Sequence, residues 1–448
     1  MNIKEFKELI RLETEKQGVK EYELYYTSSE ETSVGAYGGE INEFTSSEGN
    51  GACLRLVWDG KMGYASTEEL SAEEAVSLVA KAIDNASTLE SSDPVFLGKA
   101  GENYQDYEKK IAPLPTTDEL IGIALDTLKE VEGTTELITD KNQSQAASAK
   151  GSIAISNSNG LDLFYEYAYS VLYAVAVVQK DGEMNDGFEV ETGNYNNFDL
   201  KKLASKAAEK AVEELGAEVP ETGVVPVVLS GKAMRSLLGV YSTVFSSEAA
   251  QKGLSLLAGK EGETIAAPII NLIDDPFYKD SLMPINFDSE GSATYTKKVI
   301  ENGVLNTLLY NMQTAAKAGK KTTGNASKAS YMSAVGVRPF TMYIAPGEFS
   351  EEELFAKAGN GIYITGLNGL HAGANTISGD FSLQSNGFMI ENGKKTKAVK
   401  AFTVSGNFFE LLKKITALGN EIEKPNGGFT AFASPAVLVD NLSIAGKK

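Results

Sequence analysis

The sequence predicts an α+β fold, with an N-terminal pair of similar helix–strands–helix units followed by a larger, mainly antiparallel-β domain. In the first half, two segments with apolar residues at helical spacing flank a run of β-rich segments, and this order occurs twice. The second half consists mostly of glycine-rich strands and turns. The chain has 448 residues, more than one hydrophobic core usually organises. We therefore predict domains over residues 1–110, 111–222 and 223–448.

The first unit begins with Ile3, Phe6 and Ile10, which recur at helical spacing within residues 2–17. A meander of antiparallel strands is expected next, because short alternating segments are separated by glycine or polar turns. These segments are "YELYYTSS", "TSVGAYGG", "EINEFTSS", "GACLRLVWDG" and "KMGYAST". The unit closes with "SAEEAVSLVAKAIDNAS", where a serine N-cap and glutamates in the first turn predict a helix.

The second unit repeats this order after the proline-containing stretch "APLPTTDE". "TTDELIGIALDTLKEVEG" and "NFDLKKLASKAAEKAVEELGA" predict its two helices, and four β-rich segments lie between them. One of these, "LDLFYEYAYSVLY", alternates, so we expect its aromatic residues on the face of a long strand that packs on helices. A repeated order of elements without aligned residues indicates a duplication.

The third part begins at Val224 with a buried strand, "VVPVVLSG", and one or two helices over "KAMRSLLGVYSTVFSSEAAQKGLSLLAG". Mostly strands and turns follow. Acidic residues after Ser350 predict the start of a helix, and "NFFELLKKITALGN" predicts a short helix before the last strand, "PAVLVDNLSIAG".

Charge and cysteine content limit the classes of function. The 61 acidic against 41 basic residues give a net charge of −20, which repels a phosphate backbone, so direct nucleic-acid binding is not expected. No apolar run approaches the ~18 residues that a membrane span needs. The N-terminus lacks the apolar core of a signal peptide, and the single cysteine, Cys53, allows no intrachain disulfide. We expect a cytoplasmic protein without membrane contact.

Common catalytic motifs are absent: the sequence has no G-x-x-x-x-G-K-[ST], G-x-S-x-G or S-x-x-K. Zinc sites usually take three or four nitrogen or sulfur ligands, whereas this chain offers only His371 and Cys53, in different predicted domains. A carboxylate-only Mg²⁺ or Ca²⁺ site at Asp274 and Asp275 stays open, although adjacent carboxylates in a turn are usually just solvated.

The only histidine lies in "GLNGLHAGANTISGDFS", residues 366–382. His371, Ser378 and Asp380 could form a triad, but a triad needs a rigid scaffold and an oxyanion hole. Three members within ten residues of one glycine-rich loop would be unusual. We therefore favour a histidine satisfied by backbone hydrogen bonds in a packed turn. A metal-independent hydrolase that uses His371 remains the alternative.

Several motifs together resemble the TldD/PmbA family, whose PmbA branch is also called TldE and whose older name is "modulator of DNA gyrase". They are D-x-E-G-x-x-T in "NFDSEGSATYTKK", the following "ENGVL", "ITGLNGLHAGANTISGDFS" and "VSGNFFELL". The resemblance covers essentially the whole chain.

In this family a TldD-type subunit resembles a zinc metallopeptidase with H-E-x-x-x-H on a helix. At the matching place this chain has "LLGVYSTVF", with Gly239, Val240 and either Thr243 or Val244 instead of the three motif residues. The resemblance therefore implies a PmbA/TldE-type subunit without catalytic or metal-binding residues. It implies a TldD-type partner that carries the zinc, and peptides as substrates.

The resemblance also marks five motif residues as structural or as lining a peptide chamber: Glu290, His371, Ser378, Gly379 and Asp380. A different expectation stays open, namely a stand-alone homodimeric peptide-binding or scaffold protein without peptidase activity.

Overall fold

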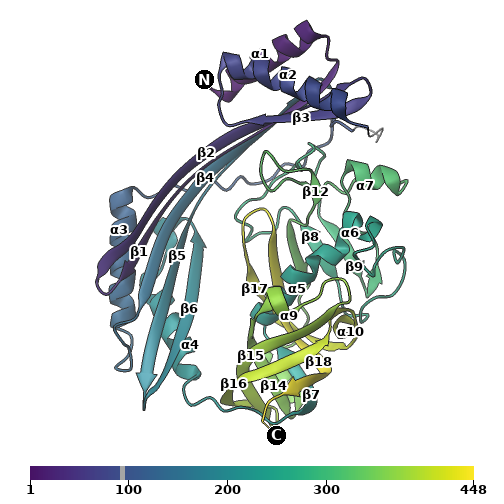
Figure 1. The fold of residues 1–448 in the computed structure, drawn as a ribbon. Coiled ribbons are helices and arrows are strands. Elements are labelled where there is room, and N and C mark those ends of the chain that lie inside the picture. The colour runs from purple at the N-terminus through teal and green to yellow at the C-terminus, as the bar shows by residue number, and fades with distance from the viewer. Residues whose placement is uncertain (91–95, 448) are drawn as a thin grey trace.

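The N-terminal half is built on one six-stranded antiparallel sheet, which curves over the C-terminal half (Figure 1). The computed structural model describes residues 1–90 and 96–447. The strand order in the sheet is β3-β2-β1-β4-β5-β6. Its strands are β1 (Glu21–Tyr37), β2 (Glu40–Trp58), β3 (Lys61–Thr67), β4 (Gln143–Asn157), β5 (Asp162–Lys180) and β6 (Glu183–Gly193).

Four amphipathic helices cover one face of this sheet, and each has a side-chain N-cap. They are α1 (Ile3–Gln17), α2 (Ala72–Thr88), α3 (Thr117–Glu132) and α4 (Leu200–Glu213). The caps are Asn2, Ser71, Thr116 and Asp199. Helices α1 and α2 pack at one end of the sheet and α3 and α4 at the other, so two separate apolar cores lie beneath them (Figure 1). The four helices predicted from apolar spacing and capping residues are thereby confirmed.

The predicted meander of five short strands is wrong in its count, because the structure has two long strands, β1 and β2, followed by the short β3. Strands β1 and β2 pair continuously from Glu21↔Val57 to Gly35↔Glu43. The serines and glycines that suggested turns have extended backbone within this ladder. The chain reverses only at Gly38 and Gly39, which both have positive φ.

The two N-terminal units share this one sheet, because β1 pairs with β4 from Glu23↔Asn157 to Tyr37↔Gln143. Each unit runs helix, three strands, helix, in agreement with the predicted order. The proposed boundaries at residues 110 and 222 thus separate repeats that are joined by backbone hydrogen bonds.

The C-terminal half is a ten-stranded mixed sheet in which antiparallel pairs predominate. Strand β18 pairs with both β16 and β7, which closes β18, β16, β15, β14 and β7 into a ring. The strands are β7 (Gly223–Leu229), β8 (Leu272–Asp275), β9 (Lys297–Glu301), β10 (Val304–Leu305), β13 (Thr341–Ile344), β14 (Gly361–Asn368), β15 (Asp380–Glu391), β16 (Lys394–Asn407), β17 (Ile415–Asn426) and β18 (Ala431–Ala445). A separate small pair is formed by β11 (Ala326–Ser327) and β12 (Gly336–Val337).

The helices of this half are short. They are α5 (Gly231–Tyr241), α6 (Ser247–Gln251), α7 (Met312–Lys317), α8 (Glu351–Ala358), α9 (Leu370–Gly373) and α10 (Phe408–Lys413), with 3₁₀ turns η1 (Tyr195–Asn197) and η2 (Ser242–Phe245) in the chain. The predicted helix after Ser350 is confirmed with a full capping box.

The helix predicted over "NFFELLKKITALGN" is half wrong. Helix α10 ends at Lys413, and Ile415 already pairs with Val439 of β18. The β-branched pair Ile415–Thr416 favours an extended backbone, and pairing with β18 decides the conformation.

The aromatic residues of β5 also lie on a different face from the one predicted. The residues that pack under α3 and α4 are Leu172, Ala174 and Ala176. The tyrosines alternate with them and therefore point to the other face, toward the C-terminal half. Alternation was recognised correctly, but it cannot tell which of the two faces the helices cover.

The two halves contact each other through an apolar cluster with members from both. Tyr25, Ile155 and Tyr165 come from the sheet, and Ile285 and Phe340 from C-terminal loops. No helix in residues 1–90 and 96–447 is long and apolar enough to cross a membrane.

Candidate functional site

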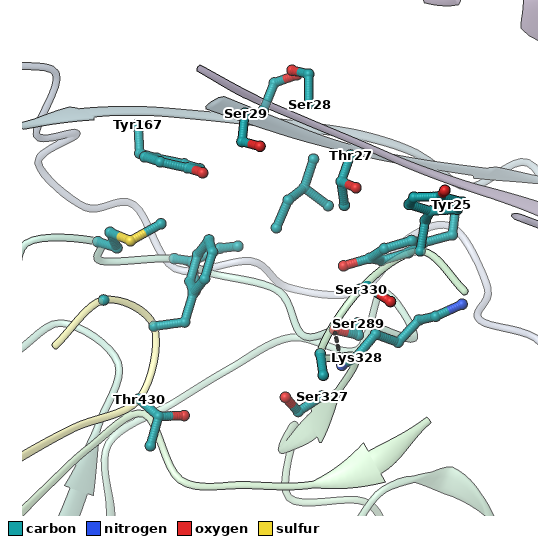
Figure 2. Close-up of a pocket in the computed structure, with 18 of the residues that line it drawn as sticks. Tyr25, Thr27, Ser28, Ser29, Tyr167, Ser289, Ser327, Lys328, Ser330 and Thr430 are labelled. Atoms are coloured by element: carbon teal, nitrogen blue, oxygen red, sulfur yellow. Dashed lines mark hydrogen bonds between the residues drawn. The ribbon is translucent and has the colours of Figure 1, made fainter. Parts of the chain in front are cut away.

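A cavity of about 820 Å³ lies between the curved sheet and the loops of the C-terminal half. In Figure 2, Thr27, Ser29 and Tyr167 of the sheet lie on one side, and Lys328 and Thr430 on the other. This volume is within the range of about 300–1,000 Å³ typical of ligand pockets. We therefore take it as the candidate site.

Strand periodicity brings the sheet residues to the cavity. In β1, even-numbered residues such as Leu24 pack under the helices, so Tyr25 and Thr27 point to the opposite face. In β2, Gly51 lies on that face, and a Cβ there would come within 2.4 Å of the Tyr331 ring. The missing side chain is thus what allows the loop carrying Tyr331 to approach the sheet.

A buried ionic cluster supports the cavity at the contact between the halves. Arg55 of β2 donates through Nε to Glu23 of β1 at 2.8 Å. Its guanidinium also lies 4.0 Å from Oε1 of Glu290, a residue of the C-terminal half. All three residues are nearly inaccessible to solvent, with exposed fractions of 6%, 1% and 3%. Such a pair is costly to break, because either partner alone would leave a buried charge.

Glu290 belongs to the sequence motif D-x-E-G, and it also holds the loop around it through a backbone hydrogen bond. Its Oε2 accepts the backbone N–H of Met312 at 2.8 Å, at the start of α7. Asp288, the first residue of the motif, accepts backbone N–H groups from Glu290, Ser292 and Ala326. The motif therefore organises a loop around two buried carboxylates.

The buried carboxylates have perturbed protonation. Burial and the neighbouring Glu290 charge raise the pKa of Asp288 to about 8, against the opposing effect of the three N–H bonds. Burial also raises the pKa of Glu290, and the Arg55 charge partly offsets this rise. Arg55 faces the carboxylates of Glu23 and Glu290, and Glu290 in turn faces Asp288, which favours a proton on one of the last two near neutral pH.

Lys328 is the basic residue nearest the centre of the sheet face. Its side chain runs beneath Tyr25 (Figure 2), and its ammonium lies 4.7 Å from the centroid of that ring. Burial lowers the pKa of Lys328, whereas burial raises the pKa of the nearby Cys53 thiol. Among the described residues, Lys328 has no salt-bridge partner within 4.0 Å, and its ammonium contacts the Tyr25 ring and the Cys53 thiol.

The other predicted motif residues lie in a second place, at the junction of β15 and β16. Asp380 faces Asn407 across the two strands, and the Asn407 amide donates to both Asp380 Oδ1 and the Ser378 carbonyl at 2.9 Å. Gly379 has a φ of +85°, and a Cβ there would lie 2.5 Å from the Phe409 ring. The "SGD" and "SGN" runs thus form one interlocked structural turn.

His371 does not join this turn as a triad member. It lies exposed on the short helix α9. In the described part of the chain, no hydrogen bond links His371 to Ser378 or Asp380, whereas Asp380 is bonded to Asn407. The packed, backbone-bonded histidine predicted from the sequence is therefore not seen: the side chain faces solvent.

Helix α5 and the following 3₁₀ turn occupy the place where the resemblance puts a TldD-type zinc site. Gly239 and Val240 offer no metal ligand, and Thr243 offers only a hydroxyl. The end of α5 is instead packed: the Tyr241 ring stacks on Phe408 with a 4.5 Å centroid distance, and its hydroxyl donates to the Asp380 carbonyl at 2.7 Å. These residues do not fit a zinc ion.

A group of three or more histidine, cysteine or acidic side chains arranged to hold a metal is likewise not found in the described ranges. Asp274, one half of the candidate carboxylate site, is fully buried on β8 and bonded to Lys297 at 3.2 Å and to Asn325 at 2.7 Å. It is therefore neither solvated nor in a turn, contrary to the sequence interpretation of this pair.

The sequence analysis missed Glu23, Arg55 and Lys328. For Arg55 a signal existed, because a lone charge stands inside the apolar run "ACLRLVW". In a strand, such a charge between Leu54 and Leu56 indicates a second buried face with its own partner. Lys328 has no comparable signal, because its burial arises only from the docking of the two halves.

Comparison with known proteins matches nearly the whole chain to the family that the sequence motifs resemble. Three family models match in order: PmbA/TldA metallopeptidase domain 1 at residues 22–86, the central domain at 106–215 and the C-terminal domain at 222–446. A protein named metalloprotease from Methanothermobacter thermautotrophicus is 29% identical, over 86% of this chain and 84% of its own.

Solved structures agree with the fold. A protein of Thermotoga maritima, named for a suspected role as modulator of a DNA gyrase, has a TM-score of 0.90 and 29% identity, covering 99% of this chain and 100% of its own. TldE from Thermococcus kodakarensis has a TM-score of 0.86 and 24% identity, covering 98% and 99%.

Proposed function

This chain belongs to the PmbA/TldD family of metallopeptidases, and from that premise we propose that it is a non-catalytic PmbA/TldE-type subunit of a zinc-dependent peptidase complex. Its partner is a TldD-type subunit that carries the zinc. The complex degrades or processes peptides.

The observation that carries the proposal is the chemistry of α5. Where the family's catalytic subunits have two histidines and a glutamate, this chain has Gly239, Val240 and the Thr243–Val244 pair. Zinc hydrolysis needs a set of protein ligands that leaves one position open for water. Glycine and valine supply neither a ligand nor a general base, so the peptide bond is cleaved on the partner.

This assignment leaves the chain two tasks, which are peptide binding and partner stabilisation. The cavity with its aromatic and hydroxyl-bearing walls supports the first task. Helix α5, which lacks the metal ligands of the catalytic subunits, packs against α10 and β15 through Tyr241, and this packing supports a structural role for that region.

The test is to purify the chain alone, a TldD-type subunit alone, and the two after co-expression. We expect zinc and chelator-sensitive cleavage of an unfolded peptide only where the TldD-type subunit is present, with the highest rate in the co-expressed sample. Robust chelator-sensitive cleavage by this chain alone would contradict the proposal.

The second candidate is a stand-alone homodimeric peptide-binding or scaffold protein. It is favoured by the hydroxyl-bearing and aromatic walls of the cavity, which suit peptide binding and need no metal. Failure to co-purify with a TldD-type subunit, together with peptide binding by the chain alone, would select this candidate over the first.

A further inference from the structure

A row of side chains along β5, here called the tyrosine stripe, consists of Tyr165, Tyr167, Tyr169, Val171 and Tyr173. These alternate residues project from the sheet face opposite α3 and α4. The rings of Tyr165 and Tyr167 have a centroid distance of 6.2 Å, and those of Tyr167 and Tyr169 have the same distance. The stripe is therefore a regular ladder of aromatic rings.

The stripe runs from a covered end to an open end. Phe429 packs on Tyr165 at 5.5 Å and edge-on against Tyr167 at 5.9 Å. At the other end, Tyr173 lies 5.5 Å from the Phe188 ring of β6, and Phe188 is 42% exposed. Large apolar side chains that remain accessible along a sheet face indicate a surface that receives a partner.

The cavity adds hydrogen-bonding groups beside the ladder. The hydroxyl-bearing residues Thr27, Ser29 and Tyr167 of the sheet and Ser327 of β11 line the cavity. Within residues 1–90 and 96–447, none of their four hydroxyls makes a hydrogen bond to the protein. A hydroxyl both donates and accepts, so such groups suit the alternating N–H and C=O groups of a peptide backbone.

We propose that the cavity and the tyrosine stripe bind an extended polypeptide segment that carries bulky apolar side chains at alternate positions and lies face-on against β5. That the occupant is a polypeptide rests on the proposed function. The proposal adds the substrate class, namely unfolded chains with apolar residues two positions apart.

The period of the ladder carries the argument. In an extended chain, side chains on one side repeat every two residues, or about 6.6–6.8 Å. The 6.2 Å spacing of the tyrosine rings is close to this repeat, so successive apolar side chains on one side of a peptide lying along β5 meet successive rings. Tyr165 is only 2% exposed beneath Phe429, so the accessible part of the stripe runs from Tyr167 to Tyr173. It spans about 20 Å, enough for on the order of six extended residues.

A polysaccharide is the other ligand that an aromatic ladder with hydroxyls could suggest. The walls favour a peptide, because Val171 interrupts the ladder and Met283, Ile285 and Phe287 form an apolar side of the cavity. These aliphatic groups contact apolar side chains well and satisfy none of the hydroxyls of a sugar.

The test measures binding of labelled octapeptides to the purified full-length chain by fluorescence anisotropy, without a partner or added metal. One peptide alternates leucine and serine, and a second has the same composition with the four leucines in one block. We expect the alternating peptide to bind about tenfold more tightly. The double variant Tyr169→Ser/Tyr173→Ser should lose this preference.

Phe164→Ser is the matched control, because Phe164 is 49% exposed on the opposite face of the same strand. It should bind both peptides as the unaltered chain does. Thermal melting of each variant checks that the fold is kept. The double variant Thr27→Val/Ser29→Ala removes two cavity hydroxyls but leaves the aromatic rings in place, and it should bind the peptides several-fold more weakly.

Equal binding of the two peptides, unchanged binding by the double tyrosine variant, or an equal loss in Phe164→Ser would each overturn the proposal. So would binding of an oligosaccharide such as a xylan fragment in place of the peptides. Because no cleavage is measured, the result is independent of whether a TldD-type partner exists, and the co-expression experiment tests that point separately.

Discussion

Replacing Arg55 by methionine removes the guanidinium that lies between the buried carboxylates of Glu23 and Glu290. Glu23 would lose its 2.8 Å bond from Arg55 Nε, and Glu290 would lose the guanidinium 4.0 Å away. With Glu23 only 1% exposed, water cannot replace the lost partner. Breaking a buried ion pair from one side typically costs about 3–5 kcal/mol. We expect Arg55→Met to lower the free energy of unfolding by that amount.

The loss should be concentrated where the two halves meet. Urea denaturation gives the total change, and hydrogen exchange measured by mass spectrometry gives its location. We expect faster exchange in residues 21–27 and 286–294, with little change in α3 and α4, because their core lies on the far face of the sheet.

Arg11 provides the control, since it also contacts two carboxylates, Glu8 and Glu15, but on the exposed surface of α1. Arg11→Met should be far less destabilising, because exposed ion pairs contribute little to stability. The double variant Glu23→Gln/Arg55→Met should recover part of the loss, because it no longer buries the unpaired Glu23 charge. If Arg55→Met is no less stable than Arg11→Met, the reasoning about the buried cluster is wrong.

Three further predictions concern other parts of the chain. Gly379→Ala should destabilise the protein by about 2 kcal/mol or more, because the left-handed φ and the Phe409 ring both oppose a Cβ. Gly369→Ala should cost only about 1 kcal/mol, since its Cβ would meet nothing within 4 Å. Chemical denaturation of both variants measures the difference. Asp274→Asn should cost about 3–5 kcal/mol by leaving the Lys297 charge buried, while Asp275→Asn on the same strand should cost about 1 kcal/mol or less; equal losses would contradict this. The folded-state pKa of Asp288 is raised to about 8, above its unfolded value of about 3.9, so its stabilising contribution is fully present below about pH 4 and is lost as the pH rises through about 8. The melting temperature should therefore fall between pH 6 and pH 9, and Asp288→Asn should reduce this pH dependence; an unchanged slope in the variant would refute the assignment.

The sequence allowed the helices to be placed well, because capping residues and apolar spacing are local signals. Thr116 and Ser350 start helices as predicted, each with a capping box. Strand lengths were less predictable. Gly49 and Gly51 look like turn residues in isolation, yet both lie within the β1–β2 ladder. At Gly51 the ring of Tyr331, from a distant loop, packs where a side chain would be.

The candidate site depended even more on long-range contacts. Glu290 was identified through its motif, but its partner Arg55 lies 235 positions earlier in the chain, and no local pattern connects them. Likewise, the alternating tyrosines of β5 predict a strand, but they do not indicate which of its two faces the helices cover. The "SGD" and "SGN" motifs both contributed to the resemblance, but their pairing through Asn407 follows only from the register of β15 and β16.

The ladder between β1 and β4 has a consequence for dissection of the molecule. A fragment that ends near residue 110 would retain α1, α2 and the first three strands but leave the β4-facing edge of β1 open along Glu23–Tyr37. An uncovered strand edge of that length is a template for pairing with other chains. The N-terminal fragment should thus self-associate rather than remain monomeric.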